Sequence, residues 1–177
     1  MSTRTLTFRL AEPGDIGAID ALLAASYPRI LKHDYPPSVI VLAVPIIARA
    51  RPRLVTSGTY YVVEMSGEGI VGAGGWTMRA GTPAEGEIRH VVTDWRFVRQ
   101  GIGRRLMTGI FADARTFGVT RFGCLATRSA VPFYQAMGFR RCGEVTVPLA
   151  PAITPTRGTF HQCTRCNGLA IFDRFAG

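Results

Sequence analysis

The sequence is nearly without lysine. Lys32 is its only lysine, so arginine supplies almost all of the positive charge behind the net charge of +9. Such an arginine excess has two interpretations, a compositional bias of the genome or a binding site for anions such as phosphates. The arginines are scattered, and no basic run carries interleaved aromatic side chains. This pattern argues against a nucleic-acid-binding protein.

Long apolar runs and secretion signals are also missing. The longest apolar stretch, 39–50, is shorter than the roughly 20 residues that cross a bilayer and is interrupted by Pro45. The N-terminus reads Met-Ser-Thr-Arg-Thr, without the apolar core of a signal peptide. We therefore expect a cytoplasmic protein that has no membrane partner.

Cysteine is sparse, with four residues in the chain. Cys163 and Cys166 form a CxxC pair, but a zinc site of the usual kind needs a second pair at a set spacing. Cys124 and Cys142 could add two thiolates, although from different strands. Free thiols are the default in a reducing compartment, and we expect no metal site.

The pattern of apolar residues predicts a single α/β domain over residues 1–177, because no linker or internal repeat divides the chain. The expected architecture is one mixed, mostly antiparallel sheet of about seven strands with helices on both faces. Asp15 is expected to cap the first helix, and residues 27–37 are expected to be irregular. The strands are expected at 6–11, 59–65, 70–78, 87–93, 121–127, 140–149 and 159–165, and further helices at 38–50, 103–117 and 129–137.

The strongest local signal is a strand that leads through a glycine-rich turn into a helix. The strand is Glu87–Thr93, the turn is Arg99–Gly103, and the helix starts near Gly103. Unpaired amides and the dipole at a helix start attract anions, and glycines at 101 and 103 let a phosphate approach the backbone. The Walker lysine and the third glycine of a dinucleotide fingerprint are absent. The remaining interpretations are another kind of phosphate cradle or a turn that needs glycine for geometry only.

Two motifs around this turn resemble the GNAT superfamily of N-acetyltransferases. Val98–Gly103 (VRQGIG) is similar to motif A of the superfamily, and Ala130–Phe139 (AVPFYQAMGF) is similar to motif B. The opening Phe8–Asp15 resembles its first strand and helix. The resemblance covers nearly the whole chain and implies the acyl-CoA N-acyltransferase fold. Val98 and Thr127 depart from the pattern, because many members carry arginine or glutamine at the first position and asparagine at the second.

The resemblance implies that acetyl-CoA is the cosubstrate and that the glycine-rich turn holds its pyrophosphate through backbone amides. The backbone of Val91–Thr93 would pair with the pantetheine arm beside a bulge, and the Val91 amide would polarise the thioester carbonyl. The cofactor-binding residues implied in this way are Val91, Val92, Thr93, Arg99, Gln100, Gly101, Ile102, Gly103, Arg104, Thr127 and Ala130.

Two catalytic residues are implied by the same resemblance. Glu87 would be the general base that deprotonates the acceptor amine; the alternative is an ion pair with Arg89, two residues further along the strand on the same side. Tyr134 would protonate the leaving thiolate, for which a phenol with a pKa of about 10 is suited. Its alternative role is aromatic packing. His90 falls on the face opposite Glu87 and is expected to be structural.

The acceptor amine is not determined by the sequence. The segments that border the acceptor groove in the superfamily match Tyr27–Arg53 and Ala150–Gly158, and the first suits an amphiphilic or aromatic amine. Core packing and a homodimer face are its alternatives. We expect transfer of the acetyl group to a primary amine of a small molecule by direct attack in a ternary complex. Acetylation of a protein lysine or N-terminus and a non-catalytic acyl-CoA sensor are the competing hypotheses.

Overall fold

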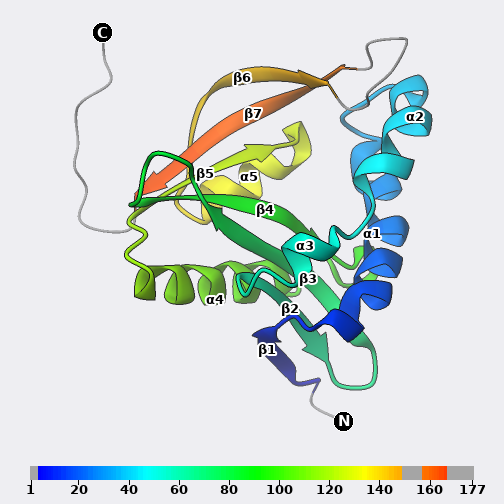
Figure 1. Cartoon of the computed structure of the whole chain (residues 1–177). Coiled ribbons are helices and arrows are strands. Elements are labelled where there is room, and N and C mark those ends of the chain that lie inside the picture. The colour runs from blue at the N-terminus through cyan, green and yellow to red at the C-terminus, as the bar shows by residue number, and fades with distance from the viewer. Residues whose placement is uncertain (1–3, 149–156, 167–177) are drawn as a thin grey trace, which may run out of the picture.

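The computed structural model describes residues 4–148 and 157–166 (Figure 1). Its strands form one seven-stranded sheet in the order β1-β2-β3-β4-β5-β7-β6. Neighbours in this sheet are antiparallel except β4 and β5, which are parallel. The mixed, mostly antiparallel sheet expected from the sequence is therefore confirmed. The strands are β1 (Leu6–Leu10), β2 (Tyr60–Met65), β3 (Gly69–Met78), β4 (Glu85–Thr93), β5 (Arg121–Ala126), β6 (Arg140–Pro148) and β7 (Arg157–Cys166).

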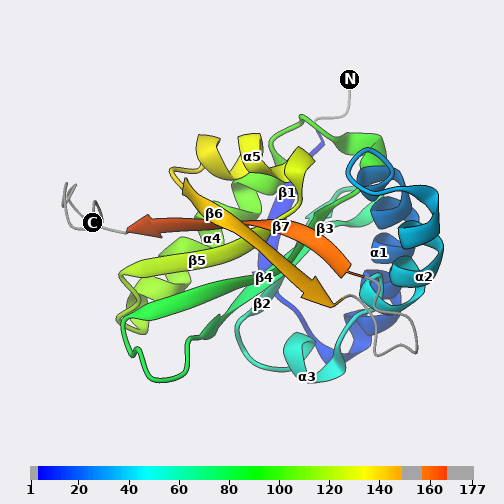
Figure 2. The same ribbon diagram turned by 90° about the horizontal axis from the view of Figure 1, so that it is seen from above.

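Helices cover both faces of the sheet, as expected. Ile19 and Leu23 of α1 pack with Val62 and Val92 in one buried cluster, whereas the helix α4 contributes to a second buried cluster with Phe122 and Trp76. Figure 2 shows α1 and α2 side by side, well apart from α4 and α5. The helices are α1 (Ile16–Leu31), α2 (Pro37–Ile47), α3 (Pro52–Val55), α4 (Ile102–Thr116) and α5 (Val131–Ala136), with 3-10 turns η1 (Pro13–Asp15), η2 (Trp95–Phe97) and η3 (Arg128–Ala130).

The first helix is longer than the sequence predicts. Residues 27–31 were expected to be irregular, which is wrong, because α1 continues through Pro28 to Leu31. Proline leaves the carbonyl four residues earlier without an N–H partner. That residue is Ala24, which is exposed, so water can satisfy its carbonyl. Leu31 is buried, and its burial stabilises the additional turn of helix.

Asp15 lies at the start of α1 but does not cap it with its side chain. Its carboxylate accepts two hydrogen bonds from the Arg9 guanidinium, at 2.7 and 2.9 Å. It also accepts the Glu12 amide at 2.8 Å, which closes a capping box on η1. The second carboxylate bound by Arg9 is that of Glu64 on β2, at 2.6 Å. Through Arg9, Asp15 therefore connects the start of α1 to β1 and β2.

The helix α4 follows the predicted apolar period. Its buried residues recur every three or four positions, and the chain leaves the helix at Gly118, which has a φ of +77°. Gly109 on this helix faces β1, where an added Cβ would overlap the ring of Phe8. The Phe8 ring stacks on Tyr61 with 4.9 Å between ring centroids. The small residue therefore lets α4 pack directly on the aromatic pair.

The structure bears in part on the expected absence of a membrane span and of a metal site. Within residues 4–148 and 157–166, no helix is long and apolar enough to cross a membrane. The side chains of the CxxC pair, Cys163 and Cys166, lie outside the described part of the structure. Among the described side chains, no three of His, Cys, Asp or Glu converge as metal ligands. A metal-free protein remains a prediction.

Candidate active site

The candidate site opens where β4 and β5 separate. These parallel strands pair only along Glu85–Glu87 and Arg121–Gly123, within the described part of the sheet. Beyond this point β4 carries one extra residue opposite β3, because the step from Ala73 to Gly75 spans Val92 to Arg89. A bulge of this kind bends its strand. The resemblance to the superfamily implied such a bulge. The bulge lies beside a cavity of about 920 Å³.

The extra residue of the bulge is held in an unusual backbone conformation. His90 has a φ of +48°, in the left-handed region that non-glycine residues rarely adopt. Its carbonyl accepts a hydrogen bond from the Tyr60 hydroxyl at 3.3 Å. The neighbouring Val91 and Val92 both line the cavity. The bulge thus turns the backbone of β4 toward the open space between the strands.

The glycine-rich turn forms one wall of this cavity. Arg99 and Gly101 both have positive φ angles, +66° and +82°. An added Cβ on Gly101 would meet no atom within 4 Å, so glycine is needed here for its backbone angle rather than for space. The first backbone hydrogen bond of α4 runs from the Arg105 amide to the Gly101 carbonyl, at 2.9 Å. The amides that precede it, from Ile102 to Arg104, are the ones that a helix leaves for an anion.

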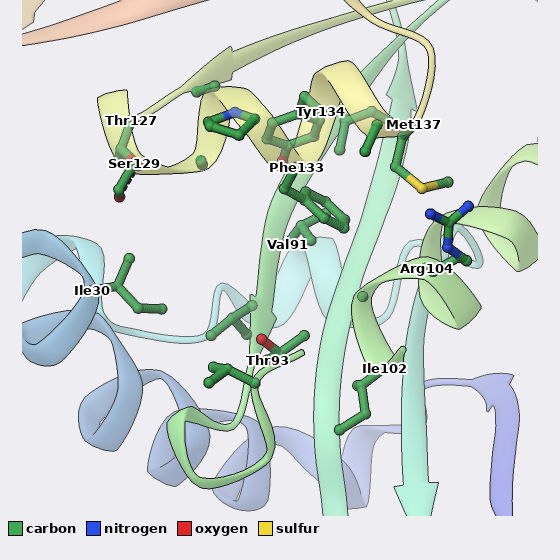
Figure 3. Close-up of a pocket in the computed structure, with 18 of the residues that line it drawn as sticks. Ile30, Val91, Thr93, Ile102, Arg104, Thr127, Ser129, Phe133, Tyr134 and Met137 are labelled. Carbon is green, nitrogen blue, oxygen red and sulfur yellow. Dashed lines mark hydrogen bonds between the residues drawn. The ribbon is translucent and has the colours of Figure 1, made fainter. Parts of the chain in front are cut away.

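Close packing of two helices shapes the same wall. An added Cβ on Gly103 would lie 3.0 Å from Cε2 of Phe133. This glycine therefore lets the first turn of α4 approach α5. Figure 3 shows Phe133 and Tyr134 on α5 across the cavity from Ile102 at the start of α4. Tyr134 is only 7% exposed and packs edge-on against Phe139, with 5.3 Å between ring centroids.

A connection between distant segments closes one side of the cavity. Asp34, in the loop between α1 and α2, accepts hydrogen bonds from the Ser129 amide at 2.8 Å and hydroxyl at 2.5 Å. Ser129 belongs to η3 and lines the cavity together with Thr127 and Ala130. This contact could not be predicted from the sequence, because the two residues are 95 positions apart.

The cavity brings together most of the residues that the sequence predicted. Glu87 and Gln100 are not among the residues that line it. Those that do line it are Val91, Val92, Thr93, Arg99, Gly101, Ile102, Gly103, Arg104, Thr127, Ala130 and Tyr134. Their roles in binding and catalysis remain predictions, whereas their gathering around one cavity is a finding.

Glu87 forms the ion pair with Arg89 that was considered as the alternative to a catalytic role. Its carboxylate pairs with the Arg89 guanidinium, and the Arg79 Nε lies 4.0 Å from Oε1. The Glu87 side chain is 34% exposed, so water reaches this cluster. A base in this position would have to release the Arg89 contact or act through water. The role of Glu87 as the base therefore remains a prediction.

His90 lines the cavity although it was expected to be structural, and Tyr27 lines it from the segment expected to border the acceptor. Burial lowers the pKa of the His90 imidazole to about 4, assisted by the charges of Arg51 and Arg89. Burial also raises the pKa of the Tyr27 hydroxyl to about 12, against a smaller opposing effect of Arg51. Both groups are thus uncharged near neutral pH. The resemblance implied a bulge beside Val91–Thr93, but it did not indicate that His90 is the extra residue.

A model of the acetyltransferase (GNAT) domain matches residues 40–148, more than half of the chain. The chain therefore belongs to the GNAT family of acetyltransferases. The comparison with curated protein sequences gave no match.

Solved structures share this fold at low sequence identity. A GCN5-related N-acetyltransferase from Rhodopseudomonas palustris is 18% identical and has a TM-score of 0.71, with 94% of this chain and 97% of that chain covered. The PaiA N-acetyltransferase from Thermoplasma acidophilum, in complex with coenzyme A, is 10% identical with a TM-score of 0.69, covering 92% and 99%. N-acetylglutamate synthase from Neisseria gonorrhoeae, complexed with coenzyme A and N-acetyl-glutamate, is 18% identical with a TM-score of 0.60, covering 94% and 36%. At these identities the likeness establishes the fold alone.

Proposed function

We propose that this protein transfers the acetyl group of acetyl-CoA to a primary amine, and that the chain acts as a single domain. The observation that carries the proposal is the start of α4, where the amides before Arg105 border a cavity that Tyr134 also lines. Structural neighbours in complex with coenzyme A support the choice of cosubstrate.

The residues of the cavity fit the proposed cosubstrate. The backbone at Gly101–Arg104 would hold the pyrophosphate, and Arg99 and Arg104 would add positive charge beside it. Arg99 and Gly101 both have positive φ angles in this turn. The slot between β4 and β5 would take the pantetheine arm, with Val91 at the bulge. Acetyl-CoA, when bound, supplies the reactive thioester.

The proposed reaction is a direct attack in a ternary complex. The amine nitrogen forms a bond to the thioester carbonyl carbon, the C–S bond breaks, and the sulfur keeps the electron pair. The Val91 amide would donate a hydrogen bond to the carbonyl oxygen as negative charge develops on it. Tyr134 would donate a proton to the sulfur, and Glu87 would accept the proton of the amine through water.

The test is release of the CoA thiol from acetyl-CoA in the presence of a panel of amines. We expect release with at least one amine, and Tyr134→Phe should lower kcat by about 10²-fold or more with little change in cosubstrate affinity, because one proton transfer is removed. Glu87→Gln should lower activity most at low pH, where the amine is protonated. Thiol release from none of the amines, with acetyl-CoA bound, would favour the sensor hypothesis.

A further inference from the structure

One side of the cavity lies away from the proposed pyrophosphate cradle. Ile30 of α1 lies across the cavity from Arg104 at the start of α4 (Figure 3). Tyr27, Leu31 and Ile47 line the cavity from α1 and α2, the same part of the fold as Ile30. We call these four residues, Tyr27, Ile30, Leu31 and Ile47, the apolar wall.

Carboxylates are missing from the lining, as far as the structure describes it. The charged residues that line the cavity are Arg99 and Arg104, both at the cradle. The Asp34 carboxylate is bound to the lining residue Ser129, but it already accepts the Ser129 amide and hydroxyl and is not itself among the lining residues. A second positive charge on a bound acceptor would therefore lose its water without gaining an ion-pair partner, which is costly.

His90 is subject to the same lack of negative charge around the cavity. It lines the cavity, and its Nδ1 is buried without a hydrogen-bond partner among the described residues. Arg51 and Arg89 oppose a positive charge on its ring. Tyr60, which donates a hydrogen bond to the His90 carbonyl, and Tyr27, which lines the same cavity, are both uncharged near neutral pH. The imidazole accordingly stays neutral, with its pKa lowered to about 4. Surroundings that keep a histidine unprotonated also disfavour an additional ammonium group.

We propose that the acceptor is a primary amine on an apolar group that carries no second positive charge. This inference rests on the proposed function, because it assigns the substrate class of the same site. The apolar wall would contact the organic group, and His90 would border the amine. The same surroundings favour loss of a proton from the attacking ammonium, which frees the lone pair that attacks the thioester carbon.

The experiment compares two amines of equal chain length, hexylamine and 1,6-diaminohexane, which differ in one terminal charge. Initial rates of CoA thiol release give kcat/KM for each, with spermidine and a short lysine peptide as additional acceptors. We expect kcat/KM for hexylamine to be at least tenfold higher than for the diamine. A ratio below tenfold, or transfer only to spermidine or the peptide, would overturn the inference and leave the proposed function standing. Thiol release with none of the four acceptors would count against the proposed function itself.

A substitution on the apolar wall links the preference to this site. Ile30→Glu places a carboxylate where the second ammonium of the diamine would lie, so the ratio of the two kcat/KM values should fall severalfold. Val41→Glu adds the same charge on α2 at a position that is 72% exposed and does not line the cavity. It should keep the wild-type ratio. An unchanged ratio in Ile30→Glu, or the same fall in both variants, would contradict the assignment.

Discussion

Replacing Gly101 by alanine tests the proposed cradle at the atom level. An alanine Cβ would meet no atom within 4 Å, so the substitution introduces no clash. Its cost comes from the φ of +82°, a left-handed angle that L-residues adopt at a penalty of roughly 1–2 kcal/mol. The exposed turn can relax to a negative φ and thereby rotate its amides away from the phosphate position.

The magnitude follows from this strain. Binding of acetyl-CoA would have to restore the left-handed angle, which should weaken the affinity by about 5- to 30-fold, corresponding to roughly 1–2 kcal/mol. Gly67→Ala is the matched control, because Gly67 has a φ of +80°, open space around it and a place in the β2–β3 turn away from the cavity. It should lower the melting temperature by about 2–4 °C for each kcal/mol without changing the affinity.

Isothermal titration calorimetry with acetyl-CoA measures both affinities, and thermal unfolding measures both stabilities. Loss of affinity in Gly101→Ala but not in Gly67→Ala would support the cradle. Equal affinities for the wild type and Gly101→Ala would contradict a pyrophosphate cradle at this turn, since the amides would then not need this turn geometry.

Two further predictions concern stability. Gly109→Ala should destabilise the fold by about 1–3 kcal/mol, because the added Cβ would overlap the Phe8 ring. Urea unfolding measures this change, and an unchanged urea midpoint would show that the Phe8 ring moves aside without loss of stability. Hydrogen bonds from Arg9 hold the pKa of Asp15 below its ordinary value, so the stabilisation is present above about pH 4 and is lost as the pH falls through the folded-state pKa. Asp15→Asn should therefore be less stable than the wild type at pH 7, by about 1–2 kcal/mol, and this difference should shrink below about pH 4; a constant difference would contradict the ion-pair assignment.

The sequence predicted the elements that have a strong period. The apolar stripe of α4 and the strand and glycine turn before it are all in place, because local spacing and glycine angles determine them. The end of α1 was missed because Pro28 suggests a break. The energetic cost of Pro28 inside the helix depends on the exposure of Ala24 and the burial of Leu31, and both are set by the tertiary structure.

The candidate site was predictable to the extent that its residues lie in contiguous motifs. Gly101 and Tyr134 belong to such motifs and line one cavity. His90 was expected to be structural, because strand alternation places it on the face opposite Glu87, whereas the bulge makes it a lining residue of the cavity. The contact of Asp34 with Ser129 depends on loops that meet only in the folded chain.

The most direct measurement of the central claim is a crystal structure of this protein with bound acetyl-CoA. We expect the pyrophosphate at the start of α4, within hydrogen-bond distance of the amides between Gly101 and Arg104, and the thioester beside Val91. A structure with the cosubstrate bound elsewhere, or with this turn closed by its own side chains, would contradict it.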